Sequence, residues 1–206
     1  YAFRKCAEAN DKAQLPTKVA AALDYLAGCH RDAGEIEKAV GVYKEASGAY
    51  MRKPDYDNAS AVLSKAAKLM ADALAGLPIR RAFVVHGEPG WDEPTPVGPF
   101  LLYDVRPGQV TCTTRSAADF GLPSCVAEDL RGGDAAFNAA ALRAVFAGTD
   151  RGAHRDALLM SAALALELTG AVDNPLEGVS RAQAAIDSGA ASAVLGRLAE
   201  FGARLR

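Results

Sequence analysis

The sequence has no excess of basic residues and no long apolar run, and each absence excludes a class of protein. Lysine and arginine number 23 against 25 aspartates and glutamates, so the formal net charge of −2 offers no positive field to a nucleic-acid backbone. The most apolar uncharged run, Ala157 to Leu166, is far shorter than the ~20 residues that a bilayer span needs. We therefore expect no nucleic-acid partner and no transmembrane segment.

Close cysteine pairs are also missing. The four cysteines, Cys6, Cys29, Cys112 and Cys125, are scattered along the chain without the spacing of a metal or redox motif. Reduced thiols and a cytoplasmic location are the plain expectation. The chain opens on Tyr1 and runs directly into a charged, alanine-rich helical pattern. We expect no signal peptide and interpret the sequence as a fragment.

A helical pattern fills the first third of the chain. Three apolar pairs, Ala22-Leu23, Val42-Tyr43 and Val62-Leu63, recur with an offset of 20 residues. Gly34 and Pro54 mark the turns between the units. A small residue follows at equivalent places, which lets neighbouring helices approach closely. The pattern predicts antiparallel helical repeats over residues 1–76.

This region resembles the tetratricopeptide-like array of gamma-type soluble NSF-attachment proteins. The resemblance rests on residues 36–40, 44–47 and 50, then 58–59, 63 and 65–70. It implies an adaptor that binds protein partners through its helical array in vesicle fusion and intracellular protein transport.

The character of the sequence changes at Gly76 and Pro78, where the helical period stops. The apolar run Ala82 to Val85 predicts a strand covered on both faces in a parallel sheet. Residues 100–105 and 109–114, separated by Arg106-Pro107-Gly108, predict a hairpin. The rest of the chain is helical in pattern, and we expect its last helices to pack on the sheet.

Two adjacent carboxylates, Asp92 and Glu93, follow that strand after a turn rich in glycine and proline. Magnesium prefers hard oxygen ligands and usually binds through one or two carboxylates together with substrate phosphates. Asp92 and Glu93 are therefore candidate metal ligands, although a solvated acidic turn would have the same sequence. His86, at the end of the strand, is either a substrate-binding residue or a hydrogen-bonded structural histidine. No residue receives a catalytic assignment.

The stretch Val84 to Glu93, with Gly132-Gly133-Asp134 and Arg155-Asp156 further on, resembles anthranilate phosphoribosyltransferase of the glycosyltransferase family 3 type. The resemblance covers residues 80–206. It implies transfer of a phosphoribosyl group from phosphoribosyl pyrophosphate (PRPP) to anthranilate in tryptophan biosynthesis, with Mg²⁺ at Asp92 and Glu93. It also implies a fold of the α/β class with a large helical part, in which helical repeats precede a partial phosphoribosyltransferase-type domain.

The family's glycine-rich pyrophosphate loop has no counterpart before residue 80. We therefore expect the chain to be incomplete and inactive by itself. The strand at residues 82–85 would also lack its parallel neighbours, and an uncovered edge strand invites association. We therefore expect that the isolated chain forms a homodimer, associates in another way or is marginally stable. Gly132-Gly133-Asp134 is open to two interpretations, a phosphate loop or an N-terminal helix cap, and the charge of Asp134 favours the cap.

Other interpretations fit the same sequence. The chain could serve only as an adaptor, with residues 80–206 as packing, or it could be an artificial fusion of two unrelated segments. A family member acting on another aromatic acceptor, or one that binds nucleic acid without catalysis, would leave a similar C-terminal sequence.

Overall fold

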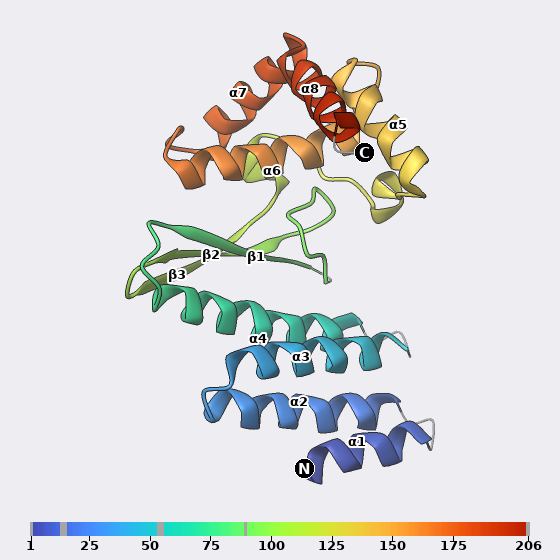
Figure 1. The fold of residues 1–206 in the computed structure, drawn as a ribbon, viewed down its shortest axis with the longest axis vertical. Helices are drawn as coiled ribbons and strands as arrows, with labels where there is room; N and C mark the ends of the chain where they lie inside the picture. Colours follow the sequence, from blue (N-terminus) through green and yellow to red (C-terminus); the bar gives the residue numbers. More distant parts are fainter. Residues whose placement is uncertain (1, 13–15, 53–55, 89, 205–206) are drawn as a thin grey trace. The chain divides into compact units, whose positions relative to one another are not determined.

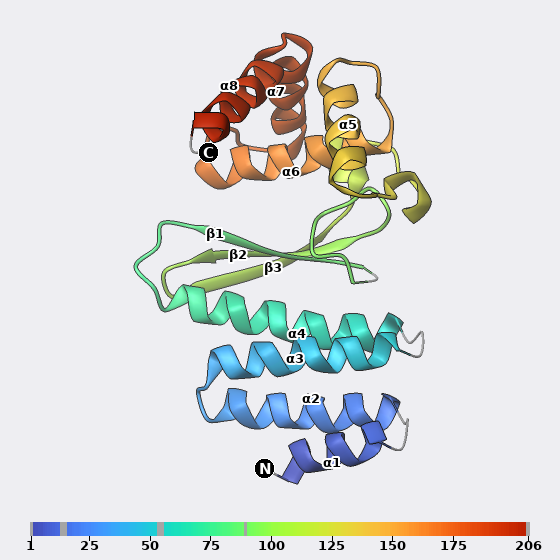
Figure 2. The same cartoon turned by 45° about the vertical axis from the view of Figure 1, so that its right-hand side comes forward.

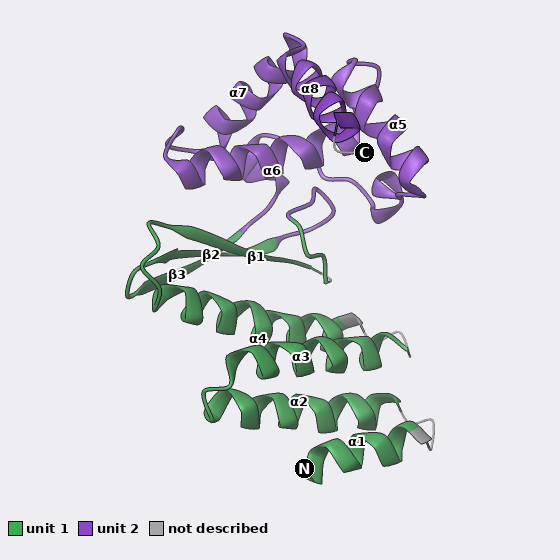
Figure 3. Ribbon diagram, viewed as in Figure 1, with its two compact units in different colours: residues 1–93, 100–114 green, residues 94–99, 115–206 purple. Residues whose placement is uncertain are grey.

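The computed structural model describes residues 2–12, 16–52, 56–88 and 90–204. Its contacts divide the chain into two compact units, coloured separately in Figure 3. Unit 1 comprises residues 1–93 and 100–114, and unit 2 comprises residues 94–99 and 115–206. Unit 1 thus joins the predicted helical segment to the strands after it. The division of the chain into domains 1–76 and 80–206 stays a prediction.

Unit 1 begins with four helices stacked in chain order (Figures 1 and 2). They are α1 (Ala2–Lys12), α2 (Pro16–Asp32), α3 (Ile36–Met51) and α4 (Tyr56–Ala75). Each helix contacts the next. The α2–α3 turn uses Gly34 at φ 76°, with Glu35 N–H donating to His30 O at 2.9 Å, so the turn predicted there is confirmed. Pro54, the other predicted turn, lies outside the described residues.

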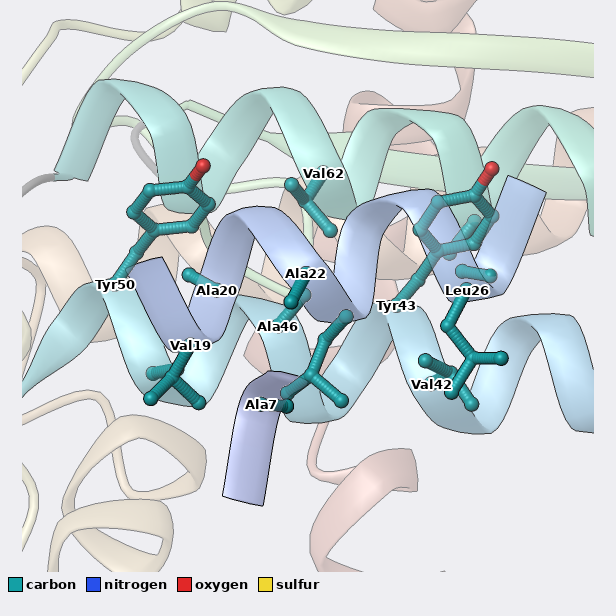
Figure 4. Close-up of a cluster of buried hydrophobic side chains, with 14 of the residues drawn as sticks. Ala7, Val19, Ala20, Ala22, Leu26, Val42, Tyr43, Ala46, Tyr50 and Val62 are labelled. Carbon is teal, nitrogen blue, oxygen red and sulfur yellow. The ribbon is translucent and has the colours of Figure 1, made fainter. Parts of the chain in front are cut away.

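Small side chains let these helices approach closely, as predicted. Ala20, Ala27, Ala39 and Ala46 are completely buried, and the ring of Tyr43 fills the space beside them at 1% exposure. Figure 4 shows Tyr43 and Tyr50 among the buried side chains of this cluster. The helices are therefore confirmed, whereas their assignment to the tetratricopeptide-like class stays a prediction.

The sheet has three strands in the order β1-β2-β3: β1 (Ala82–Gly87), β2 (Phe100–Arg106) and β3 (Gln109–Arg115). The predicted hairpin is confirmed as β2 and β3. The predicted parallel sheet is wrong, because β1 pairs antiparallel with β2, His86 facing Leu101 in the register. A parallel pair needs a crossover, usually a helix, and no helix lies in the described part of the connection between β1 and β2.

Helix α4 covers one face of this sheet. Val84 and His86 alternate with Phe83 and Val85, so the first two point to the same face. Val84 packs in a cluster with Ala67, Ala71, Tyr103 and Val105. This cluster fixes the end of β1, and hence the start of the loop after it, relative to α4.

Unit 2 is helical. Its elements are the short 3₁₀ helices η1 (Ala117–Phe120) and η2 (Ala127–Leu130), then α5 (Ala135–Phe146), α6 (Ala153–Thr169), α7 (Pro175–Asp187) and α8 (Ala190–Arg204). Helix α6 buries Leu159, Met160, Ala163 and Leu164 and packs against α7. Gly170, in the left-handed conformation at φ 73°, ends α6.

Helix α8 carries an apolar stripe that the described structure leaves exposed. Val194, Leu198 and Phe201 are 53%, 63% and 60% exposed, and α8 contains no buried residue. The expectation that the last helices pack on the sheet stays a prediction. No helix in the described part of the chain is long and apolar enough to cross a membrane.

Candidate functional site

The acidic pair lies in the loop that follows β1. Asp92 and Glu93 are both exposed, so their carboxylates are accessible to a ligand from solvent. Two residues earlier, Gly90 adopts φ 113°, which glycine tolerates and other residues rarely do. Pro89, in the same turn, lies outside the described residues.

Backbone hydrogen bonds fold this loop back onto the end of its strand. The N–H of Gly87 donates to the carbonyl of Trp91 at 2.9 Å, and the N–H of Trp91 donates to the carbonyl of Gly87 at 2.9 Å. The Gly90 N–H donates to the same Gly87 carbonyl at 2.8 Å. The acidic pair therefore follows directly after a closed bridge of backbone groups.

His86 lies immediately before this bridge and is buried, with 5% of its surface exposed. Its Nε2 is 3.1 Å from Oγ of Ser60 on α4. Burial lowers the pKa of His86 below its usual value, while Ser60 and Glu88 act in the opposite direction. His86 has the surroundings of a hydrogen-bonded structural histidine. Its role toward a substrate stays a prediction.

An open pocket of 310 Å³ lies beside His86. It is lined by Asp57, Ser60, Ala61, Ser64, His86, Glu88 and Leu101. With a buried imidazole whose pKa is lowered and two carboxylates at the lining, the pocket carries negative charge at neutral pH. Without a metal ion, a phosphate or a carboxylate would be repelled there.

The carboxylate oxygens of this loop are too few to bind magnesium without further oxygens from water or a substrate. Asp92 and Glu93 supply hard carboxylate oxygens. Within the described ranges, no three His, Cys, Asp or Glu side chains gather into a metal-binding group. A magnesium ion held by this pair would need its remaining oxygens from water or phosphate, as is usual for this ion.

Asp134, which follows the glycine pair at residues 132–133, caps helix α5, as its charge predicted. Oδ1 of Asp134 accepts a hydrogen bond from the Phe137 N–H at 2.8 Å. The N–H of Gly133 donates to Oδ1 of Asn138 at 2.9 Å. These two N–H groups at the start of α5 are thus bonded within the protein and are not available to a phosphate.

Arg155 makes an ion pair with α7 and not simply with its neighbour Asp156. Its Nη2 donates to Oδ1 of Asp187 at 2.9 Å, and the residue is 7% exposed. Burial raises the pKa of Asp156; the charge of Arg155 opposes this shift and that of Asp150 adds to it. Arg155 therefore joins the start of α6 to the end of α7.

Sequence reasoning missed Ser60 and the special role of Gly87. Ser60 lies 26 positions before His86 on a helix that the sequence assigns to the repeat region. Residues that far apart in the chain belong to separate local patterns. Neither pattern shows that the helix and the strand are in contact. The sequence indicates that Gly87 belongs to a turn, but it does not indicate that Trp91 packs against Gly87.

The family comparison matches residues 52–192 to the model described as "Glycosyl transferase family, a/b domain". The chain is 48% identical over 140 residues to an anthranilate phosphoribosyltransferase of Solibacter usitatus, covering 68% of this chain and 41% of that protein. It is 43% identical over 136 residues to that of Rubrobacter xylanophilus, covering 66% and 40%. The chain thus spans about two fifths of the length of these relatives.

Solved structures give the same relationship. The anthranilate phosphoribosyltransferase of Thermus thermophilus matches with a TM-score of 0.59 and 31% identity, covering 66% of this chain and 40% of that one. The Saccharomyces cerevisiae enzyme in complex with PRPP and Mg matches with a TM-score of 0.52 and 26% identity, covering 64% and 36%. The family match begins within the segment that the sequence assigned to helical repeats, and it includes His86, Asp92 and Glu93. This chain belongs to the glycosyl transferase family, whose α/β domain is matched by residues 52–192.

Proposed function

We propose that the loop after β1 binds PRPP through a magnesium ion, with Asp92 and Glu93 as the protein's metal ligands. The observation that carries this proposal is the pair of adjacent exposed carboxylates just past a buried strand, within the segment matched to the family. A homologous enzyme of known structure is described in complex with PRPP and Mg. Asp92 and Glu93 bind and orient the metal, and the Gly87–Trp91 bridge holds the loop that carries them.

When bound, magnesium offsets the negative charge that builds on the pyrophosphate leaving group. The transfer proposed is that of the relatives, in which a phosphoribosyl group passes to anthranilate for tryptophan synthesis. We propose further that this chain does not complete the transfer by itself. The family's glycine-rich pyrophosphate loop has no counterpart before residue 80, and the chain spans only part of its relatives.

Calorimetry with purified chain tests the binding step. PRPP should bind in the presence of Mg²⁺ and not after chelation. The variant Asp92→Asn with Glu93→Gln should weaken binding by more than about tenfold. Glu88→Gln is the matched control, because it removes one exposed carboxylate from the same loop four residues earlier. If both variants lose the same amount of PRPP affinity, the effect comes from the overall negative charge of the loop and not from metal ligands. Absence of PRPP binding by the wild-type chain would refute the proposal.

The loss of anthranilate fluorescence in the presence of PRPP and Mg²⁺ tests whether the chain is active alone. We expect no turnover by the chain itself. Turnover that disappears in the Asp92/Glu93 variant would support the metal site and refute the proposed incompleteness.

A second proposal concerns the helical array, of which α1, α2 and α3 all precede the family match. Helices α3 and α4 border an open groove of 580 Å³ whose lining includes the apolar side chains of Ile36, Val40, Met70 and Leu77. An adaptor would use such a surface for protein partners of vesicle fusion. Saturable binding of a purified membrane-fusion ATPase, lost in Met70→Glu but retained in the exposed-site control Glu8→Gln, would support it. Absence of binding by the full chain would exclude this adaptor role.

A further inference from the structure

The acidic loop is closed so tightly on Gly87 that no side chain fits at that position. A Cβ atom built on Gly87 would lie 2.8 Å from the carbonyl oxygen of Glu93 and 2.9 Å from the Cβ of Trp91. The first of these atoms belongs to the backbone and the second is rigidly attached to it, so neither moves without moving the loop. The position of Glu93 therefore depends on glycine at residue 87.

The strand end that carries Gly87 is itself held by a contact from another element. His86 pairs with Leu101 of β2 through the sheet and approaches Ser60 Oγ of α4 with its ring, at 3.1 Å. His86 is buried, and its hydrogen bond with Ser60 is partly buried beside the open pocket that both residues line. A chain of contacts therefore connects α4 to the acidic pair. It runs from Ser60 to His86 and then through Gly87 to the loop.

We infer that Ser60 and Gly87 are positioning residues for the proposed magnesium site: Ser60 fixes the end of β1 through His86, and Gly87 fixes the loop against that end. Neither residue touches the metal. This inference rests on the proposed function for its consequence in binding, but the geometry of the loop can be measured without any ligand.

Trp91 provides that measurement, because it is the chain's one tryptophan and lies within the bridge. Selective excitation of tryptophan reports on this loop alone. Ser60→Ala should shift the Trp91 emission to longer wavelength and increase its quenching by acrylamide, since the loop is less firmly held. Gly87→Ala should produce a larger shift. Circular dichroism and thermal unfolding identify any variant that simply fails to fold.

Ser64→Ala is the matched control. Ser64 lies one turn further along α4, lines the same pocket and hydrogen-bonds with Tyr103 rather than His86. It should leave the Trp91 signal unchanged. Ser60→Thr keeps the hydroxyl group and should restore wild-type emission. Equal shifts in Ser60→Ala and Ser64→Ala, or no shift in Ser60→Ala and Gly87→Ala, would overturn the inference.

Calorimetry then separates this inference from the proposed function. Ser60→Ala should weaken Mg²⁺-dependent PRPP binding by about threefold to tenfold, the net effect of losing one hydrogen bond, and Ser64→Ala should not. If the wild-type chain binds no PRPP while Trp91 responds as expected, the proposed function fails and the positioning path stands. If PRPP binding depends on Asp92 and Glu93 but not on Ser60, the positioning role fails.

Discussion

Arg115 and Glu167 form a two-point ion pair in unit 2. Arginine Nη1 lies 2.6 Å from Oε2 of the glutamate, and Nη2 lies 2.9 Å from Oε1. The Glu167 side chain is only 9% exposed and that of Arg115 is 21% exposed. This geometry joins the segment that begins at Arg115 to the last turns of α6, both within unit 2, and makes the pair a specific constraint on the fold of that unit.

Replacing Arg115 should therefore destabilise the protein. Arg115→Ala removes both hydrogen bonds from a largely buried carboxylate and should lower the free energy of unfolding by about 2–3 kcal/mol. Arg181→Ala removes an exposed pair with Glu177 one turn away and should cost about 0.5 kcal/mol or less. Urea denaturation measures both. Similar losses of unfolding free energy in the two variants would show that burial does not make the Arg115–Glu167 pair stronger than an exposed pair.

The α6–α7 contact should not tolerate a side chain at Gly178. A Cβ there would lie 2.8 Å from the Cβ and 2.9 Å from the Cα of Ala163, so Gly178→Ala should destabilise by about 1–3 kcal/mol. Gly196→Ala on α8 is the control, because its Cβ would meet no atom within 4 Å. It should stabilise the helix by up to about 1 kcal/mol. Thermal unfolding that ranks the two variants in the reverse order would refute this packing.

The stability of the chain should fall as the pH is lowered through the histidine range. Burial lowers the pKa of His86 from its usual value of 6.5, so the unfolded state takes up this proton at a higher pH than the folded state. The unfolded state then binds more protons, and stability decreases as the pH falls through about 6.5 towards the folded pKa.

His86→Gln should remove this part of the pH dependence. Denaturation midpoints of both proteins at about pH 7.5 and about pH 5.5 give the comparison, in which contributions common to both proteins, such as that of Asp156, cancel. An unchanged difference between the two pH values would show that His86 does not carry the effect.

The edge of β1 should promote association. The strand order places β1 at one side of the sheet. Among the described residues, the outer edge of β1 is bridged only at Gly87, by Trp91, and an open edge with apolar residues such as Val85 is a template for another strand. We expect concentration-dependent dimers or larger species in sedimentation velocity. Val85→Lys should shift the distribution towards monomer. A monodisperse wild-type monomer with sharp thermal unfolding would count against this expectation.

Local signals in the sequence identified most of the elements. The apolar period and Gly34 predicted the first helices and their turn, and Arg106-Pro107-Gly108 predicted the hairpin of β2 and β3. Asp134 marked the start of a helix. These features depend on residues a few positions apart, so propensity and periodicity were sufficient to find them.

Long-range relationships were decided only by the tertiary structure. The run Ala82 to Val85 indicated a buried strand but not its antiparallel pairing, because strand direction depends on the partner. The stripe on α8 indicated an amphipathic helix but not whether anything covers it. The sequence by itself determined which side chains carry the proposed chemistry, Asp92 and Glu93. The fold decided how they are held, since the contacts of Ser60 with His86 and of Gly87 with Trp91 exist only when α4, β1 and the loop come together in space.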